Sequence, residues 1–180
     1  LLRVPPHLQA ALDAGHTGWQ EVRYIADQLN LHLNGDLLGG RNELIFGEAG
    51  ADSLLGGIGN DTLHGGIGND TLFGGAGADR FEFMALNEVG DLILDFSTVD
   101  DLLVITGSAF GGGLTAGTLG SNQFQSSVNT AAASAAVRFI FNTSNKTLWF
   151  DSDGSGAAGP VMVAELQAVA IVNHADILIV

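Results

Sequence analysis

Four aspartates recur at intervals of nine residues in the middle of the chain: Asp52, Asp61, Asp70 and Asp79. Arg80 is the only lysine or arginine between Gly47 and Phe83, so the column has no regular basic partner. Carboxylates and backbone carbonyls are ligands of calcium, which takes about six to eight oxygens and tolerates irregular geometry. Magnesium is disfavoured, because it demands near-ideal octahedral geometry and keeps several waters. The spacing therefore predicts calcium sites.

Each nine-residue unit contains a turn and a very short strand. The first six positions follow GGxGxD, where glycine permits backbone angles that other residues avoid. The last three positions form a minimal strand in which only the central side chain faces inward. These central residues are Leu54, Leu63, Leu72 and Phe81. Two units complete one coil, so the repeat predicts a mostly β fold, a thin right-handed parallel β-roll that acts as a calcium-binding solenoid.

Units two apart lie on the same edge of such a roll. Asp52 is therefore expected to share a site with Asp70, and Asp61 with Asp79. A shorter copy of the unit places Glu43 in the same acidic column. One inward side chain in nine residues makes a small core, and neighbouring carboxylates repel one another. Bound calcium would supply the missing stabilisation.

The composition of the 180-residue chain restricts its partners. With 6 Lys+Arg against 20 Asp+Glu and a net charge of −14, it lacks the basic patches that bind nucleic acid and anionic membranes. It contains no cysteine, which excludes disulfides and zinc–thiolate sites. No apolar run approaches the ~20 residues of a membrane span. The first residues lack the pattern of an N-terminal secretory signal, which suggests a processed piece of a longer protein.

The sequence divides into three parts. Residues 1–33 carry apolar residues at helical spacing and are expected to form a short helical cap or the tail of an upstream domain. Residues 34–83 hold the β-roll repeats. Residues 84–180 are β-rich and are expected to form a β-sandwich-like region. Within it, the runs at 137–141 and 147–151 are predicted to pair as a hairpin.

The stretch GGIGNDTLHGGIGNDTLF, in register with the units on either side, resembles the RTX family, the hemolysin-type repeats-in-toxin nonapeptide GGxGxDxUx. The resemblance covers about Gly47 to Glu82 and implies sets of calcium ligands. One ion would be held by Glu48, Gly50, Asp52, Gly65, Ile67 and Asp70, although Glu48 replaces a glycine of the pattern. A second ion would be held by Gly57, Gly59, Asp61, Gly74, Ala76 and Asp79. A third site would open on Gly66, Gly68 and Asp70, and the repeats do not supply its far half.

The C-terminal part resembles the ends of RTX exoproteins in the stretches GADRFEF, DLILDF and DILIV. In that family the extreme C-terminus is the uncleaved signal for the type I secretion machinery. The resemblance implies a secreted, extracellular module that folds on calcium and carries the export signal of a larger exoprotein. The alternative is that DILIV is simply the final strand of the fold.

Further carboxylates have weaker cases. Asp91 and Asp95 stand four residues apart in a predicted strand, hence on one face, and are candidates for an extra calcium ion or for an exposed strand face. The stretch DSDGSG (Asp151–Gly156) looks like the opening of a calcium loop, but Met162 stands where the loop needs a glutamate, which favours a turn.

Enzyme motifs are absent from the sequence, which contains neither HExxH nor GxSxG. We therefore expect a non-catalytic module, whose parent protein is free to be a protease, lipase or epimerase. The alternative function is a module that attaches a secreted enzyme or adhesin to polysaccharide or to a cell surface.

Overall fold

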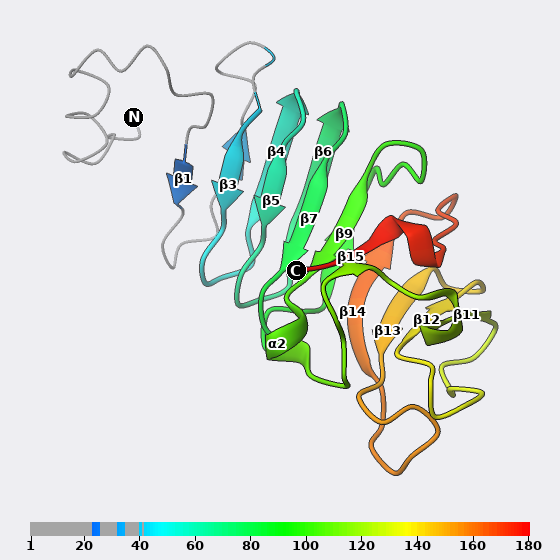
Figure 1. The fold of residues 1–180 in the computed structure, drawn as a ribbon. Helices are drawn as coiled ribbons and strands as arrows, with labels where there is room; N and C mark the ends of the chain where they lie inside the picture. Colours follow the sequence, from blue (N-terminus) through cyan, green and yellow to red (C-terminus); the bar gives the residue numbers. More distant parts are fainter. Residues whose placement is uncertain (1–22, 26–31, 35–39, 41) are drawn as a thin grey trace.

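The computed structural model describes residues 23–25, 32–34, 40 and 42–180, and these form a mostly β structure of two facing sheets (Figure 1). The first sheet contains, in spatial order, β1 (Arg23–Ile25), β3 (Leu44–Phe46), β5 (Thr62–His64), β7 (Arg80–Phe83), β9 (Leu102–Ile105), β15 (Ile177–Ile179) and β10 (Gly117–Thr118). The second contains β11 (Phe124–Ser127), β12 (Phe139–Asn142), β13 (Thr147–Phe150), β14 (Val161–Leu166), β8 (Asp91–Ile93), β6 (Thr71–Ala76), β4 (Ser53–Ile58) and β2 (His32–Asn34).

Helical structure in the described part is limited to short segments. These are α2 (Gly107–Phe110) and the 3-10 turns η2 (Ser121–Gln123) and η3 (His174–Asp176). Among the described residues, none of the helices has the length and apolar character needed to cross a membrane.

The repeat zone forms a parallel β-solenoid, as the nine-residue period predicts. The chain passes from one sheet to the other at each unit, so β4 pairs in parallel with β6, and β5 with β7. The register places Leu54 opposite Leu72 and Leu63 opposite Phe81, which confirms the predicted stacking. In Figure 1 these strands run side by side as successive coils.

The turns of the solenoid gather along two edges. We call the edge formed by turns 47–52, 65–70 and 84–90 the first edge; these turns lead into strands of the second sheet. The second edge is formed by turns 56–61, 74–79 and 94–101, which lead into strands of the first sheet. Each six-residue GGxGxD segment therefore lies on one edge; in the second-edge segments the first three residues form the ends of β4 and β6.

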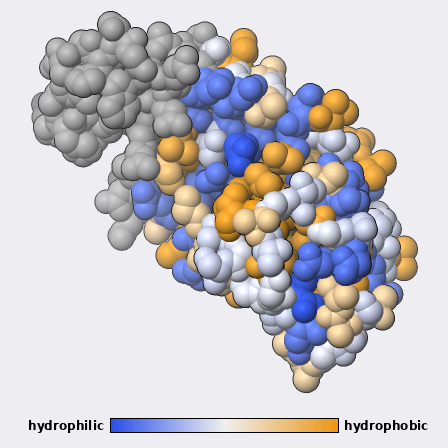
Figure 2. All heavy atoms as spheres, viewed as in Figure 1, coloured by the Kyte–Doolittle hydropathy of each residue, from blue (hydrophilic) through white to orange (hydrophobic). Residues whose placement is uncertain are grey.

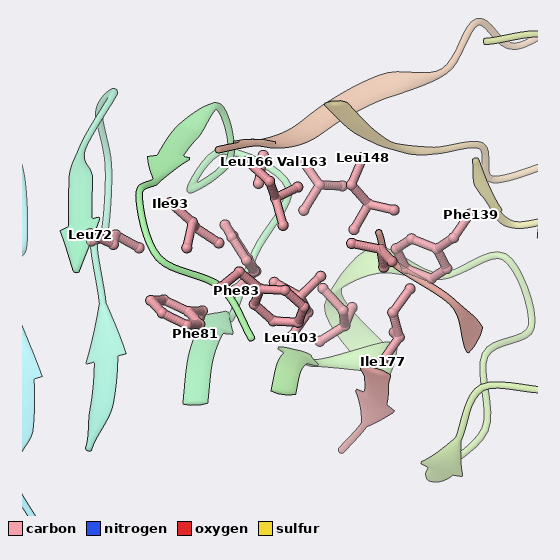
Figure 3. Close-up of a cluster of buried hydrophobic side chains, with 14 of the residues drawn as sticks. Leu72, Phe81, Phe83, Ile93, Leu103, Phe139, Leu148, Val163, Leu166 and Ile177 are labelled. Carbon is pink, nitrogen blue, oxygen red and sulfur yellow. The ribbon is translucent and has the colours of Figure 1, made fainter. Parts of the chain in front are cut away.

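One continuous hydrophobic core runs through the described part. The inward residues of the repeats are at most 1% exposed: Ile45, Leu54, Leu63, Leu72 and Phe81. Figure 3 shows this row continuing past Leu103 to Phe139 and Ile177 of the C-terminal strands. Outside the core, the visible face carries hydrophilic residues with small apolar clusters between them (Figure 2).

The C-terminal strands extend both sheets of the solenoid. β8 and β9 continue the parallel ladders beyond β6 and β7. β14 then adds to β8, and β15 adds to β9, both in parallel. β12 and β13 pair antiparallel, which confirms the predicted hairpin. The aperiodic half of the chain is thus built onto the end of the roll.

The N-terminal helical prediction is wrong where the structure describes this region. β1 and β2 lie inside residues 1–34, and they pair in parallel with β3 and β4. An unpaired strand edge presents rows of amide and carbonyl groups, and adding a strand satisfies them. Helix propensity is a weak preference that such tertiary pairing overrides. The other residues predicted to be helical, 1–22 and 26–31, lie outside the described part.

Replacing Leu63 by alanine should destabilise the calcium-loaded protein by about 2–5 kcal/mol, because Leu63 is fully buried and is the inward apolar residue of its nine-residue unit. Urea unfolding in excess calcium measures the change. Ile58→Ala is the matched control, since Ile58 is 60% exposed at a turn and its loss should cost less than about 0.5 kcal/mol. Equal losses in the two variants would contradict the inward stacking of Leu63.

Candidate metal centre

The aspartates of the first edge form a column in which each carboxylate reaches the turn before it. The amide of Asp52 donates to Oδ1 of Asp70 at 2.8 Å. The amide of Asp70 donates to Oδ1 of Asp91 at 3.0 Å. Asp52, Asp70 and Asp91 are between 1% and 3% exposed, so the column is buried. The structure therefore brings Asp52 and Asp70 together, as predicted, and places Asp91 next in line.

The second edge repeats the arrangement. Asp61 Oδ1 accepts from the amide of Glu43 at 2.8 Å, and Asp79 Oδ1 accepts from the amide of Asp61 at 2.8 Å. Asp101 Oδ1 then accepts from the amide of Asp79 at 2.9 Å, and Asp101 is 6% exposed. The predicted pair Asp61 and Asp79 is thus present, and it is extended by Glu43 on one side and by Asp101 on the other.

Sequence reasoning missed Asp101 as a member of the second column. Its local signal resembles that of the repeats, because an aspartate is followed two positions later by a fully buried apolar residue, here Leu103. The same signal, with Ile93 as the buried residue, marks Asp91. The turns before these two aspartates differ in length from the repeats and lack the GGxG glycines, so the nine-residue period does not reach them.

In three aspartates of the columns, the second carboxylate oxygen has no hydrogen-bond partner in the described part of the chain. Among the described residues, this holds for buried Oδ2 of Asp61, Asp70 and Asp79. A buried charged oxygen without a partner is costly, and a cation is the group that would satisfy it.

The second carboxylate oxygens, Oδ2, lie beside backbone carbonyls of the neighbouring turn. A Cβ atom added to Gly56 would fall 2.6 Å from Oδ2 of Asp61 and closer still to the carbonyl oxygen of Gly74. A Cβ on Gly47 would fall 3.0 Å from Oδ2 of Asp52 and closer to the carbonyl oxygen of Gly65. Carboxylate and carbonyl oxygens that the resemblance assigns to one ion thus converge in both predicted sites.

Asp91 lies next to the donors of the expected third site, whose far half the repeats do not supply. A Cβ on Gly65 would fall 2.8 Å from Oδ2 of Asp91 and closer to Oδ2 of Asp70, so the two carboxylates meet beside this glycine. In the two regular sites the corresponding neighbour is a carbonyl oxygen. The third site therefore contains two aspartates, as the other two do, but they lie differently around the glycine at the start of the turn.

Glycines are required where one turn lies against the next. Gly66 and Gly68 have φ values of 95° and 150°, and a side chain there would collide with the carbonyl oxygens of Glu48 and Gly50. Gly75 and Gly77 stand in the same way against the carbonyls of Gly57 and Gly59 on the second edge.

Glu48 takes the backbone conformation of the glycine that it replaces, with a φ of 71°. Its carbonyl oxygen accepts from the amide of Ile67 at 2.7 Å, while the carbonyl of Ile67 accepts from the amide of Gly50 at 2.9 Å. On the second edge, the carbonyl of Ala76 accepts from the amide of Gly59 at 2.9 Å. Each carbonyl has a second lone pair, so these bonds leave room for a metal ligand role.

Asp91 and Asp95 lie on different edges of the roll, which corrects the prediction that they lie on one strand face. β8 ends at Ile93, so the alternation of side chains stops before Asp95. Asp95 instead lies on the second edge, where its two oxygens accept from the amides of Gly74 and Gly75 at 2.9 and 2.7 Å. Asp91 belongs to the first edge, at the opposite end of β6.

The donor set fits calcium, because it combines buried carboxylates with backbone carbonyls and contains no sulfur. Within the described ranges, no group of three or more His, Cys, Asp or Glu side chains is arranged to hold a metal by itself. An ion at these edges must therefore take several of its oxygens from the turn backbone, as calcium does in irregular loops.

Comparison of the sequence with models of known families also points to calcium. Residues 39–72 and 46–81 match the family model described as the RTX calcium-binding nonapeptide repeat, which has 4 copies. The chain carries RTX repeats. RTX nonapeptide repeats bind calcium, so the acidic columns on the two edges belong to a calcium-binding β-roll.

Two solved structures from Azotobacter vinelandii are similar to this chain, and both are subunits of a mannuronan C5-epimerase. The solution structure of the AlgE6R3 subunit is 27% identical, with a TM-score of 0.49, and the match covers 87% of this chain and 78% of that one. The AlgE6R2 subunit is 26% identical, with a TM-score of 0.47, and the match covers 88% of this chain and 91% of that one. No curated protein matches the chain.

Burial shifts the acidity of the RTX columns. Desolvation, together with the repulsion of nearby carboxylates, raises the pKa of Asp91 to about 8 and that of Asp79 to about 6. Desolvation also raises the pKa values of Asp61, Asp70 and Asp101. Without a cation the folded roll therefore holds protons that the unfolded chain, with aspartate pKa values near 3.9, would release.

Stability in calcium-free buffer should fall as the pH rises from about 4 to about 8. A folded pKa raised above its unfolded value stabilises the fold below the unfolded pKa, and this contribution is lost as the pH rises through the folded values of about 6 for Asp79 and about 8 for Asp91. Circular dichroism and chemical unfolding across this range measure the effect. Saturating calcium should abolish it, since the ion replaces the protons. A calcium-free stability that is flat or rises with pH would contradict the burial of the columns.

Proposed function

We propose that the chain is a non-catalytic RTX module of a larger secreted protein, which folds when it meets extracellular calcium. The observation that supports this most directly is that the buried Oδ2 atoms of Asp61, Asp70 and Asp79 have no hydrogen-bond partner among the described residues. The net charge of −14 adds to the repulsion that must be overcome before the roll can close. Calcium would supply the positive charge between the columns.

We propose three calcium sites. The first joins turns 47–52 and 65–70 through Glu48, Gly50, Asp52, Gly65, Ile67 and Asp70. The second joins turns 56–61 and 74–79 through Gly57, Gly59, Asp61, Gly74, Ala76 and Asp79. The third uses Gly66, Gly68 and Asp70 and is closed by Asp91, whose carboxylate lies beside that of Asp70.

The residues of each turn hold consecutive turns together and bind the ion between them. The glycines allow the carbonyls of consecutive turns to approach, while each aspartate binds the amide of the turn before it through one oxygen and offers the other to the ion. Binding energy gained only in the folded state becomes folding energy. Extracellular calcium modules bind in about the millimolar range, so the roll would stay open in the calcium-poor cytosol and close outside the cell.

Asp70→Asn should raise the calcium concentration needed for folding by about tenfold or more, because Asp70 serves both the first and the third site and ligand charge sets calcium affinity. Asparagine keeps the acceptor for the amide of Asp52, so the loss reports on charge. Circular dichroism during calcium titration, after treatment with a chelator, measures the midpoint.

Asp100→Asn is the control for that titration, since Asp100 is exposed in a turn and lies outside the columns. Its midpoint should match that of the unmodified chain. If the unmodified chain keeps its β signal in chelator, calcium does not drive its folding, and the proposed function fails. Equal midpoints for the two variants would instead misplace the ions.

We further propose that residues 176–180 serve as the type I export signal, on the strength of the resemblance of DILIV to RTX exoprotein ends. In the folded state this segment has a second role, because β15 lies between β9 and β10, and Ile177 is fully buried. The secretion machinery would read the segment before folding, and the folded module would use it as a strand.

Two substitutions separate these roles. Val180→Asp changes a side chain that is 54% exposed, so it should impair export while the purified, calcium-loaded protein keeps its stability. Ile177→Ala removes buried volume and should cost about 2–5 kcal/mol of stability while the chain still reaches the medium. Protein in medium and cytosol of a secreting host, together with urea unfolding, measures both effects. Normal export of Val180→Asp would place the signal elsewhere.

Attachment to polysaccharide or to a cell surface stays the alternative function. The excess of acidic residues, 20 against 6 basic ones, disfavours a direct contact with an anionic polysaccharide. A titration of the calcium-loaded protein with neutral and with anionic polysaccharides would detect this activity.

A further inference from the structure

We infer that Asp95 ends the second edge of the roll, and that its carboxylate stands in for the backbone carbonyls that another calcium turn would provide. This places Asp95 as a positioning residue for the last RTX turn and not as a ligand. The inference deepens the proposed calcium function, but it rests on contacts that the structure shows directly.

Turn amides in the regular coils donate to carbonyls of the coil that follows. The amide of Gly47 donates to the carbonyl of His64, and that of Gly59 to the carbonyl of Ala76, both at 2.9 Å. Gly74 holds the same repeat position as Gly47. Its amide donates instead to Oδ1 of Asp95 at 2.9 Å, and the amide of Gly75 donates to Oδ2 at 2.7 Å. One side chain thus replaces the carbonyl that Gly47 uses at this repeat position, and it also accepts from the next amide along the chain.

Contacts of the residues on either side of Asp95 fix the backbone there, and the Asp95 carboxylate lies against Gly74 and Gly75 of the last repeat. The amide of Leu94 donates to the carbonyl of Leu72 at 3.0 Å, which continues the ladder for one residue beyond β8. Phe96 is buried, 3% exposed, with its ring 6.1 Å from that of Phe81. The carbonyl of Phe96 accepts from Nε2 of Gln167 at 2.7 Å. Both neighbours of Asp95 are therefore fixed.

A carboxylate is a strong acceptor for this position. Hydrogen bonds to a charged group are shorter and stronger than neutral ones, and two of them satisfy the amides at the open end of β6. Unpaired amides at the end of a parallel stack would otherwise invite another strand. The cost is electrostatic, since Asp95 and Asp101 help to raise the pKa of Asp79.

The two edges of the roll consequently end differently. On the first edge, Asp91 meets Asp70 through oxygens that can hold an ion. On the second edge, the oxygens of Asp95 already accept from Gly74 and Gly75, so the regular sites stop at the pair Asp61 and Asp79. The first edge carries its calcium sites one turn further than the second.

Asp95→Asn tests the inference, with Asp100→Asn as control, because Asp100 lies in the same turn and is exposed. Asparagine keeps one acceptor, and its amide group faces an N–H donor. In calcium-loaded protein, hydrogen exchange of the Gly74 and Gly75 amides should speed up by about tenfold, the effect of losing one hydrogen bond, with the bound calcium count unchanged. Unchanged exchange, or a count lower by one ion, would overturn the inference.

A measurement on the unmodified chain covers the case in which Asp95→Asn fails to fold. Scalar couplings across the hydrogen bonds, from the Gly74 and Gly75 amide nitrogens to the Asp95 carboxylate carbon, should be present. Their absence would overturn the inference. A chain that folds without calcium would defeat the proposed function and yet leave these couplings and the exchange rates intact, so the two failures can be told apart.

Discussion

The carboxylate-to-amide bond between consecutive turns controls the geometry of the whole roll. Oδ1 of Asp70 accepts from the amide of Asp52, and the same bond recurs down both edges. It fixes the spacing of the coils and, because an aspartate has only two oxygens, it leaves one of them buried and facing the turn backbone. The register of the strands and the demand for a cation therefore come from one side chain.

That bond also explains why the turn sequence tolerates so little change. Coils that approach closely enough for an aspartate to reach the previous amide bring the carbonyl of Gly50 against Gly68, where no side chain fits. The position of Glu48 does accept another residue, since Glu48 replaces a glycine of the pattern and still adopts a positive φ. The contacts of the Glu48 carbonyl oxygen depend on the backbone alone. A role of that carbonyl as a calcium ligand therefore does not require a particular side chain at this position.

The repeats, their inward residues and the pairing of the aspartates could be predicted from the sequence, because each depends on a local pattern of nine residues. Contacts set by the path of the chain could not be. Asp101 enters the second column through a turn of different length, and Asp95 leaves its expected strand face because β8 stops at Ile93. The strand at Arg23–Ile25 pairs with β3, a contact that the helical spacing of apolar residues in that part of the sequence does not reveal.

A solenoid with one inward residue per turn needs a structure to end on, because its last coil would expose a row of backbone donors and a narrow apolar seam. The C-terminal half meets both needs. Asp95 and Asp101 accept the amides of the last second-edge turn, while Leu103 and Ile177 continue the seam into a broader core. The acidic side chains that would repel one another in an open chain thus also close the end of the roll, so ion binding and termination of the repeat draw on the same chemistry.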